Sequence, residues 1–217
     1  MKIESGIGQS IPRIEGEDKV TGRLPYLGDL QISGMLHGKI LRSGHAHAKI
    51  RGIDASRAAK LPGVVAVLTR DDVIGNPRYH SHYGPVLKDQ PIVALDRVRY
   101  VGDPVAAVAA TGPEVAEEAL ELIAVDYEEL PEVTDPEEAL AEDAPLLHEK
   151  MELPRQGFVD LRDVAPQEGT NICNRFQLKK GDVEKGFAES DHVFEDVFNS
   201  PATQHAALET HIAIAQF

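Results

Sequence analysis

Residues 97–127 read RVRYVGDPVAAVAATGPEVAEEALELIAVDY and carry, in order, the signals of two strands, a helix and a further strand. Residues 97–101 alternate polar and apolar side chains, and residues 104–110 form an almost wholly apolar run, so both segments are predicted to be strands. The tight Gly102-Asp103 connection between them favours a hairpin or a sharp reversal within one sheet.

The clearest helical pattern of the chain follows directly. Pro113 falls in the first turn, where a missing N–H costs nothing, and acidic side chains stand near the positive end of the helix. Apolar residues recur at spacings of three, four and seven, as a helix with one packed face requires: Val115, Ala116, Ala119, Leu120 and Ile123. A strand is predicted next, over residues 124–127.

Shorter elements are predicted on both sides of this stretch. Upstream, an extended segment is predicted at 11–30, followed by strands at 34–42, 48–53 and 64–68. Short helices are predicted at 56–60 and after Thr69. The strand at 64–68 is almost wholly apolar and is expected to be buried. A long loop, 75–90, carries His80 and His82. Downstream lie small helices at 136–141 and 183–188, capped by Asp135 and Asp182, and strands at 176–180, 192–198 and 205–215.

The composition restricts the possible partners. Lys and Arg number 22 against 36 Asp and Glu, which gives 22 − 36 = −14 and disfavours nucleic acid and anionic membrane surfaces. The acidic residues concentrate between 114 and 152, which indicates a solvated face and an acidic linker. No stretch approaches the ~20 apolar residues of a membrane span and the N-terminus has no secretory pattern, so a cytoplasmic location is predicted.

Cys173 is the one cysteine of the chain. No intrachain disulfide can form, and neither a Cys-ligated iron–sulfur cluster nor a Cys-rich zinc site can be built from this chain alone. A nucleophilic role is the alternative, but no local base accompanies the thiol. Cys173 is therefore predicted to be a small buried hydrophobic residue in the first strand after the linker.

An ordered series of motifs resembles one protein family. The series is Lys19-Val-Thr-Gly22, Tyr26-x-x-Asp29, Leu36-His37, Arg42-Ser43-x-His45-Ala-His47-Ala48-x-Ile50, Ile53-Asp54, Leu61-Pro-Gly-Val64, Ala66-Val67-x-Thr69, Tyr100-Val-Gly-Asp-Pro-Val-Ala106 and Val125-x-Tyr127-Glu128-x-Leu130-Pro131. In order and spacing it resembles the a/b hammerhead domain of xanthine dehydrogenase/aldehyde oxidase-type molybdenum hydroxylases. The segments Gly181-Asp182-Val183-Glu184-x-x-Phe187-x-x-Ser190-Asp191 and His205-Ala-Ala-Leu208-Glu209-Thr210-His211 resemble the start of that family's molybdopterin-binding domain.

The resemblance implies an α+β fold, with a hammerhead domain of mixed strands and short helices followed by an incomplete α+β molybdopterin-binding domain. The expected organisation is an extended N-terminal segment (1–16), the hammerhead domain (17–133), an acidic, Pro-rich linker (134–168) and the truncated start of the molybdopterin-binding domain (169–217). The family's substrate specificity and catalytic glutamate are expected beyond Phe217. No residue of this chain is therefore assigned as catalytic or as a metal ligand, and its cofactor-binding residues are unknown.

Several polar constellations compete with structural roles for the same residues. His45 with His47, and His80 with His82, could each bring two imidazoles to one face of a strand, but no further ligands are evident, so packing or loop roles are favoured. His205, Glu209 and His211 would share one face of the strand predicted at 205–215, as a ligand set would. The resemblance instead places this segment in the second domain's core or near the cofactor cavity, and so implies a structural role near the site rather than direct catalysis. The loop around Arg78-Tyr79-His80 is a weaker candidate for contact with substrate or a partner.

The resemblance thus implies that this chain is a scaffold in a larger oxidoreductase. The whole assembly would hydroxylate an N-heterocycle or an aldehyde with water as oxygen source. It would hold a molybdenum–molybdopterin cofactor, which this chain alone would not bind, and iron–sulfur clusters and FAD on partner subunits or domains. Two alternatives remain: a stand-alone hammerhead protein that binds a partner without a cofactor, and a hydrolase using the histidines, which lacks the Gly-x-Ser-x-Gly pattern.

Overall fold

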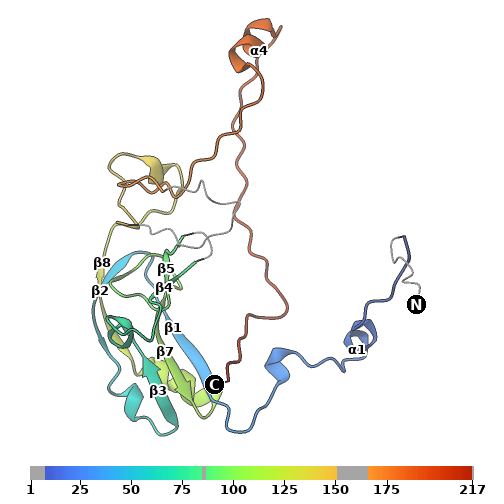
Figure 1. Cartoon of the computed structure of the whole chain (residues 1–217). Coiled ribbons are helices and arrows are strands. Elements are labelled where there is room, and N and C mark those ends of the chain that lie inside the picture. The colour runs from blue at the N-terminus through green and yellow to red at the C-terminus, as the bar shows by residue number, and fades with distance from the viewer. Residues whose placement is uncertain (1–7, 85–86, 151–165, 217) are drawn as a thin grey trace. The chain divides into compact units, whose positions relative to one another are not determined.

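The computed structural model describes residues 8–84, 87–150 and 166–216 (Figure 1). Gly34–Asp182 form one compact unit, and the described residues of Met1–Ser33 and Val183–Phe217 group as a second. The first unit contains two three-stranded antiparallel sheets, short helices and a two-stranded ribbon. This mixture confirms the α+β class.

The sheet that forms the larger core has the order β1-β7-β3. It consists of β1 (His37–Arg42), β7 (Pro104–Ala110) and β3 (Val64–Leu68), with β7 antiparallel to both neighbours. The strands predicted at 34–42, 64–68 and 104–110 are therefore confirmed. The apolar β7 run is central because both of its edges are paired.

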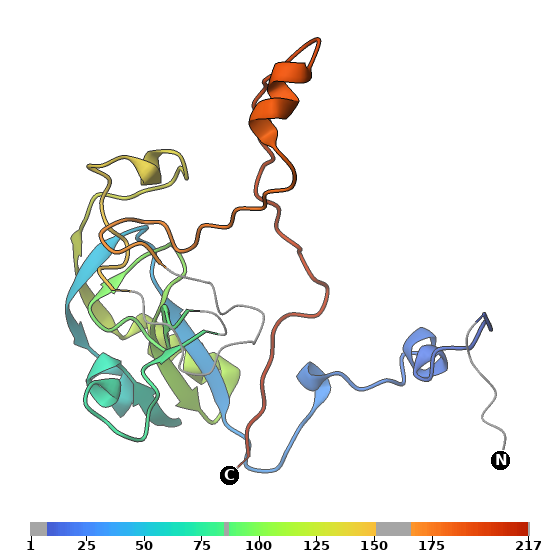
Figure 2. The same ribbon diagram turned by 45° about the horizontal axis from the view of Figure 1, so that its top comes forward.

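Helix α3 (Pro113–Glu121) covers one face of this sheet, and lies behind the blue strand β1 in Figure 2. Ala116 and Ala119 are fully buried and pack with Ala106, Val108 and Ala110 of β7, so alanine side chains set the close approach of helix and sheet. The expectation that 64–68 is a buried strand is wrong in part, because β3 is an edge strand whose bulge between Val64 and Ala66 leaves Val65 59% exposed.

The second sheet has the order β6-β2-β8 and consists of β6 (Arg97–Val98), β2 (Ala48–Asp54) and β8 (Ala124–Glu129). The hairpin expected between 97–101 and 104–110 is wrong: β6 pairs with β2, whereas β7 pairs with β1 and β3. Gly102, with φ of +96°, turns the chain from one sheet into the other. A second core lies here: Ala48, Ile50, Ala94, Val98 and Val105.

Short elements complete this unit. Thr69 and Asp72 form the capping box of α2 (Arg70–Val73), and Asp135 accepts two backbone N–H bonds at the start of the 3-10 turn Glu138–Leu140. A further 3-10 turn spans Ala58–Lys60. The segment 75–90, expected to be a loop, also contains the short ribbon β4 (His82–Tyr83) and β5 (Gln90–Pro91).

The second unit has little packed structure in its described residues. It contains α1 (Gly16–Val20), a 3-10 turn (Leu27–Asp29) and α4 (Val183–Glu189), so the expectation that residues 11–30 are extended is wrong at two turns. The first of these turns is held by Arg23, which pairs with Glu17 and Asp18. The helix predicted after Asp182 is confirmed.

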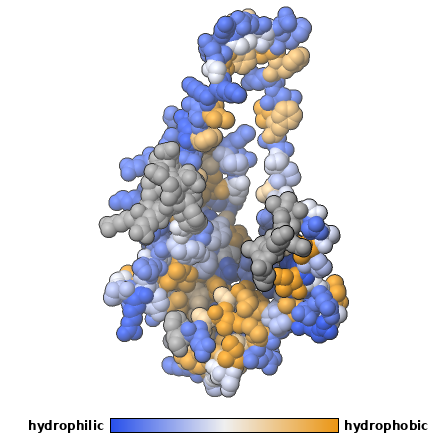
Figure 3. Space-filling view, turned by 45° about the vertical axis from the view of Figure 1, so that its right-hand side comes forward, coloured by the Kyte–Doolittle hydropathy of each residue, from blue (hydrophilic) through white to orange (hydrophobic). Residues whose placement is uncertain are grey.

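The strands expected at 176–180, 192–198 and 205–215 are not formed. Their alternating pattern has no neighbouring strand to pair with among the described residues, and an unpaired strand is not stable in water. Large apolar side chains are consequently exposed: Phe194 at 92% and Phe198 at 88%. Figure 3 shows hydrophobic side chains in orange on the segment that carries α4, at the top of the view. Residues 1–7 of the extended segment predicted at 1–16, and residues 151–165 of the linker predicted at 134–168, lie outside the described residues.

Candidate functional site

The buried polar side chains of the described residues are Ser43, His47 and Asp103. Ser43 and Asp103 lie on two loops that are joined by backbone hydrogen bonds. The Ser43 N–H donates to the Asp103 carbonyl at 2.9 Å, and the Gly102 N–H donates to the Ser43 carbonyl at 2.8 Å. These bonds join the end of β1 to the turn before β7. They fix the start of the His45-Ala46-His47 segment that the sequence singled out.

The Ser43 hydroxyl serves the backbone of this segment. Its Oγ accepts from the His45 N–H at 2.9 Å and donates to the His45 carbonyl at 3.1 Å. A nucleophilic serine needs a hydrogen bond to the ring of a base. Ser43 bonds to the His45 main chain instead, so the arrangement does not support the hydrolase alternative at this position.

Asp103 is a buried carboxyl group with a structural partner. One carboxylate oxygen accepts the Arg99 backbone N–H at 3.0 Å. Burial raises the pKa of Asp103 above its ordinary value of 3.8, while the hydrogen bond and the Arg99 charge act in the opposite direction. The carboxyl group thus holds the turn after β6.

The two histidines of the His45-Ala46-His47 segment have separate partners. The His45 ring packs on Tyr127, with centroids 4.6 Å apart, and its Nδ1 lies 3.3 Å from a carboxylate oxygen of Glu129. The His47 Nδ1 lies 2.7 Å from the carbonyl oxygen of Pro131, which can only accept, so this nitrogen carries the proton. His47 Nε2 is buried and has no hydrogen-bond partner within the described structure.

A shared ion is not indicated at any of the histidine constellations. Within residues 8–84, 87–150 and 166–216, no three His, Cys, Asp or Glu side chains are placed to hold a metal. His80 is exposed, and His82 Nδ1 is within 3.0 Å of the neighbouring Ser81 hydroxyl. His205, Glu209 and His211 lie exposed on coil, so the expected common strand face is not formed.

The prediction for Cys173 is wrong. Its side chain is exposed and lies on coil, because the strand expected to bury it is not formed. The Arg78-Tyr79-His80 loop is also exposed, and its interaction with substrate or a partner stays a prediction.

An attachment that sequence reasoning missed joins residues 147–149 to the strand β6. Arg99 Nε donates to the Leu147 carbonyl at 2.7 Å, and Arg97 pairs with Glu149 at 2.9 Å and with Asp96 at 2.9 Å. Residues 147–149 show no periodicity of their own, which is why the sequence predicts only a linker here. The contacts come from Arg99, 48 residues before Leu147, and from Arg97, 52 residues before Glu149. No local sequence pattern reveals partners so far apart.

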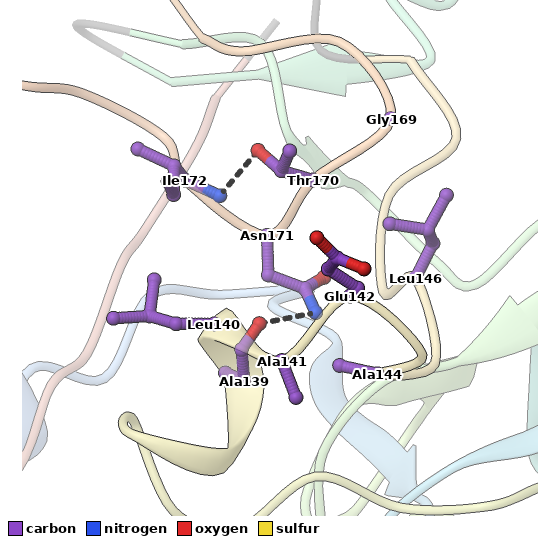
Figure 4. A pocket seen from close by; sticks show the side chains of 10 residues that line it. All are labelled: Ala139, Leu140, Ala141, Glu142, Ala144, Leu146, Gly169, Thr170, Asn171 and Ile172. Carbon is purple, nitrogen blue, oxygen red and sulfur yellow. Dashed lines mark hydrogen bonds between the residues drawn. The ribbon is translucent and has the colours of Figure 1, made fainter.

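Asn171 forms a second such attachment (Figure 4). Its side-chain oxygen accepts from Leu147 N–H at 3.0 Å, and its amide nitrogen donates to the carbonyls of Ala139 and Pro145 at 3.2 and 3.0 Å. The cavity beside it is lined by Leu140, Ala141, Leu146 and neighbouring residues, and has a volume of about 120 Å³.

This cavity does not fit a pterin cofactor. Small-molecule sites span about 300–1,000 Å³, well above the volume beside Asn171. The coil after α4 offers no cluster of glycines whose N–H groups could approach a phosphate. Neither this cavity nor the coil after α4 therefore offers a site for the molybdenum cofactor that the resemblance implies.

Comparison with known protein families assigns most of the chain. Residues 21–131 match the family description "Aldehyde oxidase and xanthine dehydrogenase, a/b hammerhead domain". The chain belongs to the aldehyde oxidase and xanthine dehydrogenase family. Residues 164–217 match a second family description, "Molybdopterin cofactor-binding domain". The resemblance stated from the motifs is thereby confirmed.

Curated relatives and solved structures agree. A Bacillus subtilis protein, named as a probable subunit of xanthine dehydrogenase, is 44% identical over 94% of this chain and 24% of its own length. The gamma subunit of the 6-hydroxypseudooxynicotine dehydrogenase complex of Paenarthrobacter nicotinovorans is 34% identical over 98% of this chain and 25% of its own length. Quinoline 2-oxidoreductase from Pseudomonas putida 86 superposes with a TM-score of 0.56 at 41% identity, over 65% of this chain and 18% of that one.

The chain therefore spans about a quarter of the length of these curated relatives. A Cu,Mo-CO dehydrogenase structure gives the same picture, with a TM-score of 0.58 at 42% identity over 64% of this chain and 17% of that one. No helix among the described residues is both long and apolar enough to cross a lipid bilayer.

Proposed function

We propose that this chain is the N-terminal part of the molybdopterin-binding subunit of a xanthine dehydrogenase/aldehyde oxidase-type hydroxylase, and that it acts there as scaffold. The observation that carries the proposal is the contrast between its two matched regions. Residues 21–131 match the hammerhead domain and contain the packed cores, whereas residues 164–217 match the cofactor-binding domain, and their described part, 166–216, is almost wholly exposed.

We divide the chain as its motifs suggest, into an extended segment (1–16), the hammerhead domain (17–133), a linker (134–168) and the first part of the cofactor-binding domain (169–217). Exposed Phe176, Phe194 and Phe198 support the last assignment, because aromatic side chains of this size belong in a core. The rest of the core would come from the remaining part of the subunit.

The activity belongs to the whole assembly. It oxidises a substrate C–H bond: R–H + H2O gives R–OH, two protons and two electrons, where R is the ring carbon of an N-heterocycle or the acyl carbon of an aldehyde. The molybdenum–molybdopterin group supplies the oxidising chemistry, and iron–sulfur and flavin partners carry the electrons away. The base that activates the water is not on this chain, and the expected location is the cytoplasm.

This chain would contribute rigidity and positions rather than reacting groups. Ser43, Asp103 and Arg99 fix the junction between the two sheets through backbone hydrogen bonds. Arg97, Arg99 and Asn171 attach the segment that leads towards the cofactor-binding domain. A scaffold of this kind would fix the position at which the cofactor-binding domain begins.

A second candidate is a stand-alone hammerhead protein that binds a partner without a cofactor. The self-contained cores within Gly34–Asp182 favour it, because they need nothing outside this chain. Limited proteolysis separates the two. The scaffold proposal predicts that in the isolated chain residues 166–217 are cleaved first while 34–150 resist, and that 166–217 are protected in the assembly. Equal protection of both regions in the isolated chain would contradict it.

A further inference from the structure

One face of the β1-β7-β3 sheet is packed, and the opposite face is not. On the packed side, Ala106, Val108 and Ala110 are at most 2% exposed beneath α3. The opposite side, which we call the open face, carries two rows of residues that run across the three strands. Its residues are Ile40, Ala107 and Leu68 in one row, and Gly38, Ala109 and Ala66 in the other.

The open face is apolar and accessible. All six positions are aliphatic or glycine, with no charged or hydrogen-bonding side chain among them. Ile40 is 46% exposed, Ala66 is exposed, and a Cβ placed on Gly38 would meet no atom within 4 Å. Antiparallel sheets that face water normally alternate apolar and polar side chains, so an apolar second face indicates burial against another element.

The small side chains define what fits. Gly38, Ala66, Ala107 and Ala109 leave the backbone of three adjacent strands close to the surface. An element that packs here can therefore approach closely and place large aliphatic or aromatic side chains over the alanines, beside Ile40 and Leu68. The partner surface over these six positions must be apolar, because they offer no side-chain hydrogen bond to a polar one. Arg42, the next exposed position of β1, borders the open face at its end, where its guanidinium donates to the Gly102 carbonyl.

We infer that the open face is the docking surface for a later segment of the same molybdopterin-binding subunit, and that this segment presents large apolar side chains. The inference rests on the proposed function. The curated relatives are about four times as long as this chain, since it covers 24 and 25% of their lengths, so most of the subunit that could cover this face lies outside these residues. Helix α3 already occupies the other face.

Cysteine accessibility tests the inference. In a Cys173→Ser background, Ile40→Cys and Ala66→Cys are labelled with a maleimide, in the 217-residue chain and in the full-length subunit of its native assembly. Both cysteines are expected to react freely in the isolated chain and at least tenfold more slowly in the assembly. Glu118→Cys on the exposed side of α3 provides the matched comparison and reports general crowding of the reagent.

A second set of variants tests assembly itself. Ile40→Lys and Ala66→Lys are expected to leave the unfolding transition of the isolated chain in place while reducing recovery of the full-length assembly at least fivefold. Ala124→Lys, at an exposed strand position of the other sheet, should assemble normally. Assembly of Ile40→Lys at wild-type levels would overturn the inference.

The outcomes also separate this inference from the proposed function. If the wild-type assembly contains molybdenum while Ile40→Cys stays fully reactive in it, the docking surface is wrong and the proposed function stands. If Ile40→Cys becomes protected in the isolated chain as its concentration rises, a second copy is the occupant and the inference is overturned. A full-length protein without molybdenum would contradict the proposed function itself.

Discussion

The Nε atom of Arg99 donates a 2.7 Å hydrogen bond to the backbone carbonyl of Leu147, a residue 48 positions further along the chain. This bond attaches the segment that follows the hammerhead motifs to the turn that directly follows strand β6. The Arg99 side chain is 18% exposed and also lies 3.4 Å from Asp96, so the contact is shielded from solvent.

Replacement of Arg99 should release this segment. Arg99→Met is expected to lower the free energy of unfolding by about 1–3 kcal/mol, because a hydrogen bond from a charged donor is lost and a partly buried carbonyl is left without it. Hydrogen exchange at residues 144–149 should rise in parallel. Arg57→Met, which removes the same charge at an exposed position, should change stability by less than about 0.5 kcal/mol. Equal effects of the two variants would contradict the assigned role.

Asn171 gives an independent test of the same attachment. Asn171→Asp keeps an acceptor for Leu147 N–H but turns the two donated bonds to Ala139 and Pro145 into contacts between oxygens. The expected loss is about 2 kcal/mol of unfolding free energy, measured by chemical denaturation. Cys173→Ser, two residues away and exposed, should be nearly neutral. An unperturbed Asn171→Asp variant would show that the amide does not hold the segment.

The attachment should weaken in acid through His148. Burial lowers the pKa of His148 below its ordinary 6.5, and the Arg99 charge adds to this, while Asp89 and Asp96 oppose it. The unfolded segment therefore binds more protons than the folded one, so stability falls as pH drops from about 6.5 through the lowered pKa. Exchange rates at 139–149, corrected for intrinsic pH dependence, should rise between about pH 7.5 and 5.5. His148→Gln should remove that rise, and a rise of the same size in His148→Gln would exclude His148 as its source.

Gly63 should tolerate no side chain. Its φ is +94°, and an added Cβ would lie 2.9 Å from the Thr111 hydroxyl and 3.2 Å from a Val115 methyl group. Gly63→Ala therefore combines backbone strain with overpacking beside α3, and should cost about 1–3 kcal/mol more than Gly75→Ala. Gly75 has a similar φ of +72° and open space. Comparable melting temperatures for the two variants would refute the steric explanation.

Most of the hammerhead elements could be predicted from the sequence because their signals are local. The alternation of β1, the apolar run of β7 and the stripe and first-turn proline of α3 each lie within a dozen residues. The pairing of the strands with one another could not be predicted in this way, because it depends on residues far apart in the sequence. Residues 97–101 and 104–110 look like a hairpin, but Gly102 sends them to different sheets, because each finds its partners elsewhere in the chain.

The polar junction was only partly predictable for the same reason. Ser43, His45 and His47 stand out in the sequence, but their partners Asp103, Tyr127 and Pro131 lie more than fifty residues away. In the region after residue 169, alternation predicted strands that do not form, since a strand needs a neighbour that the described residues do not supply.

A chain that works as part of a molybdenum hydroxylase subunit must be found with molybdenum in its native complex. The most direct test is purification under native conditions from its own host, followed by the mass of the intact complex and its molybdenum content. We expect a large assembly with about one molybdenum per copy of this sequence. A bare chain of 23.6 kDa without molybdenum would contradict it.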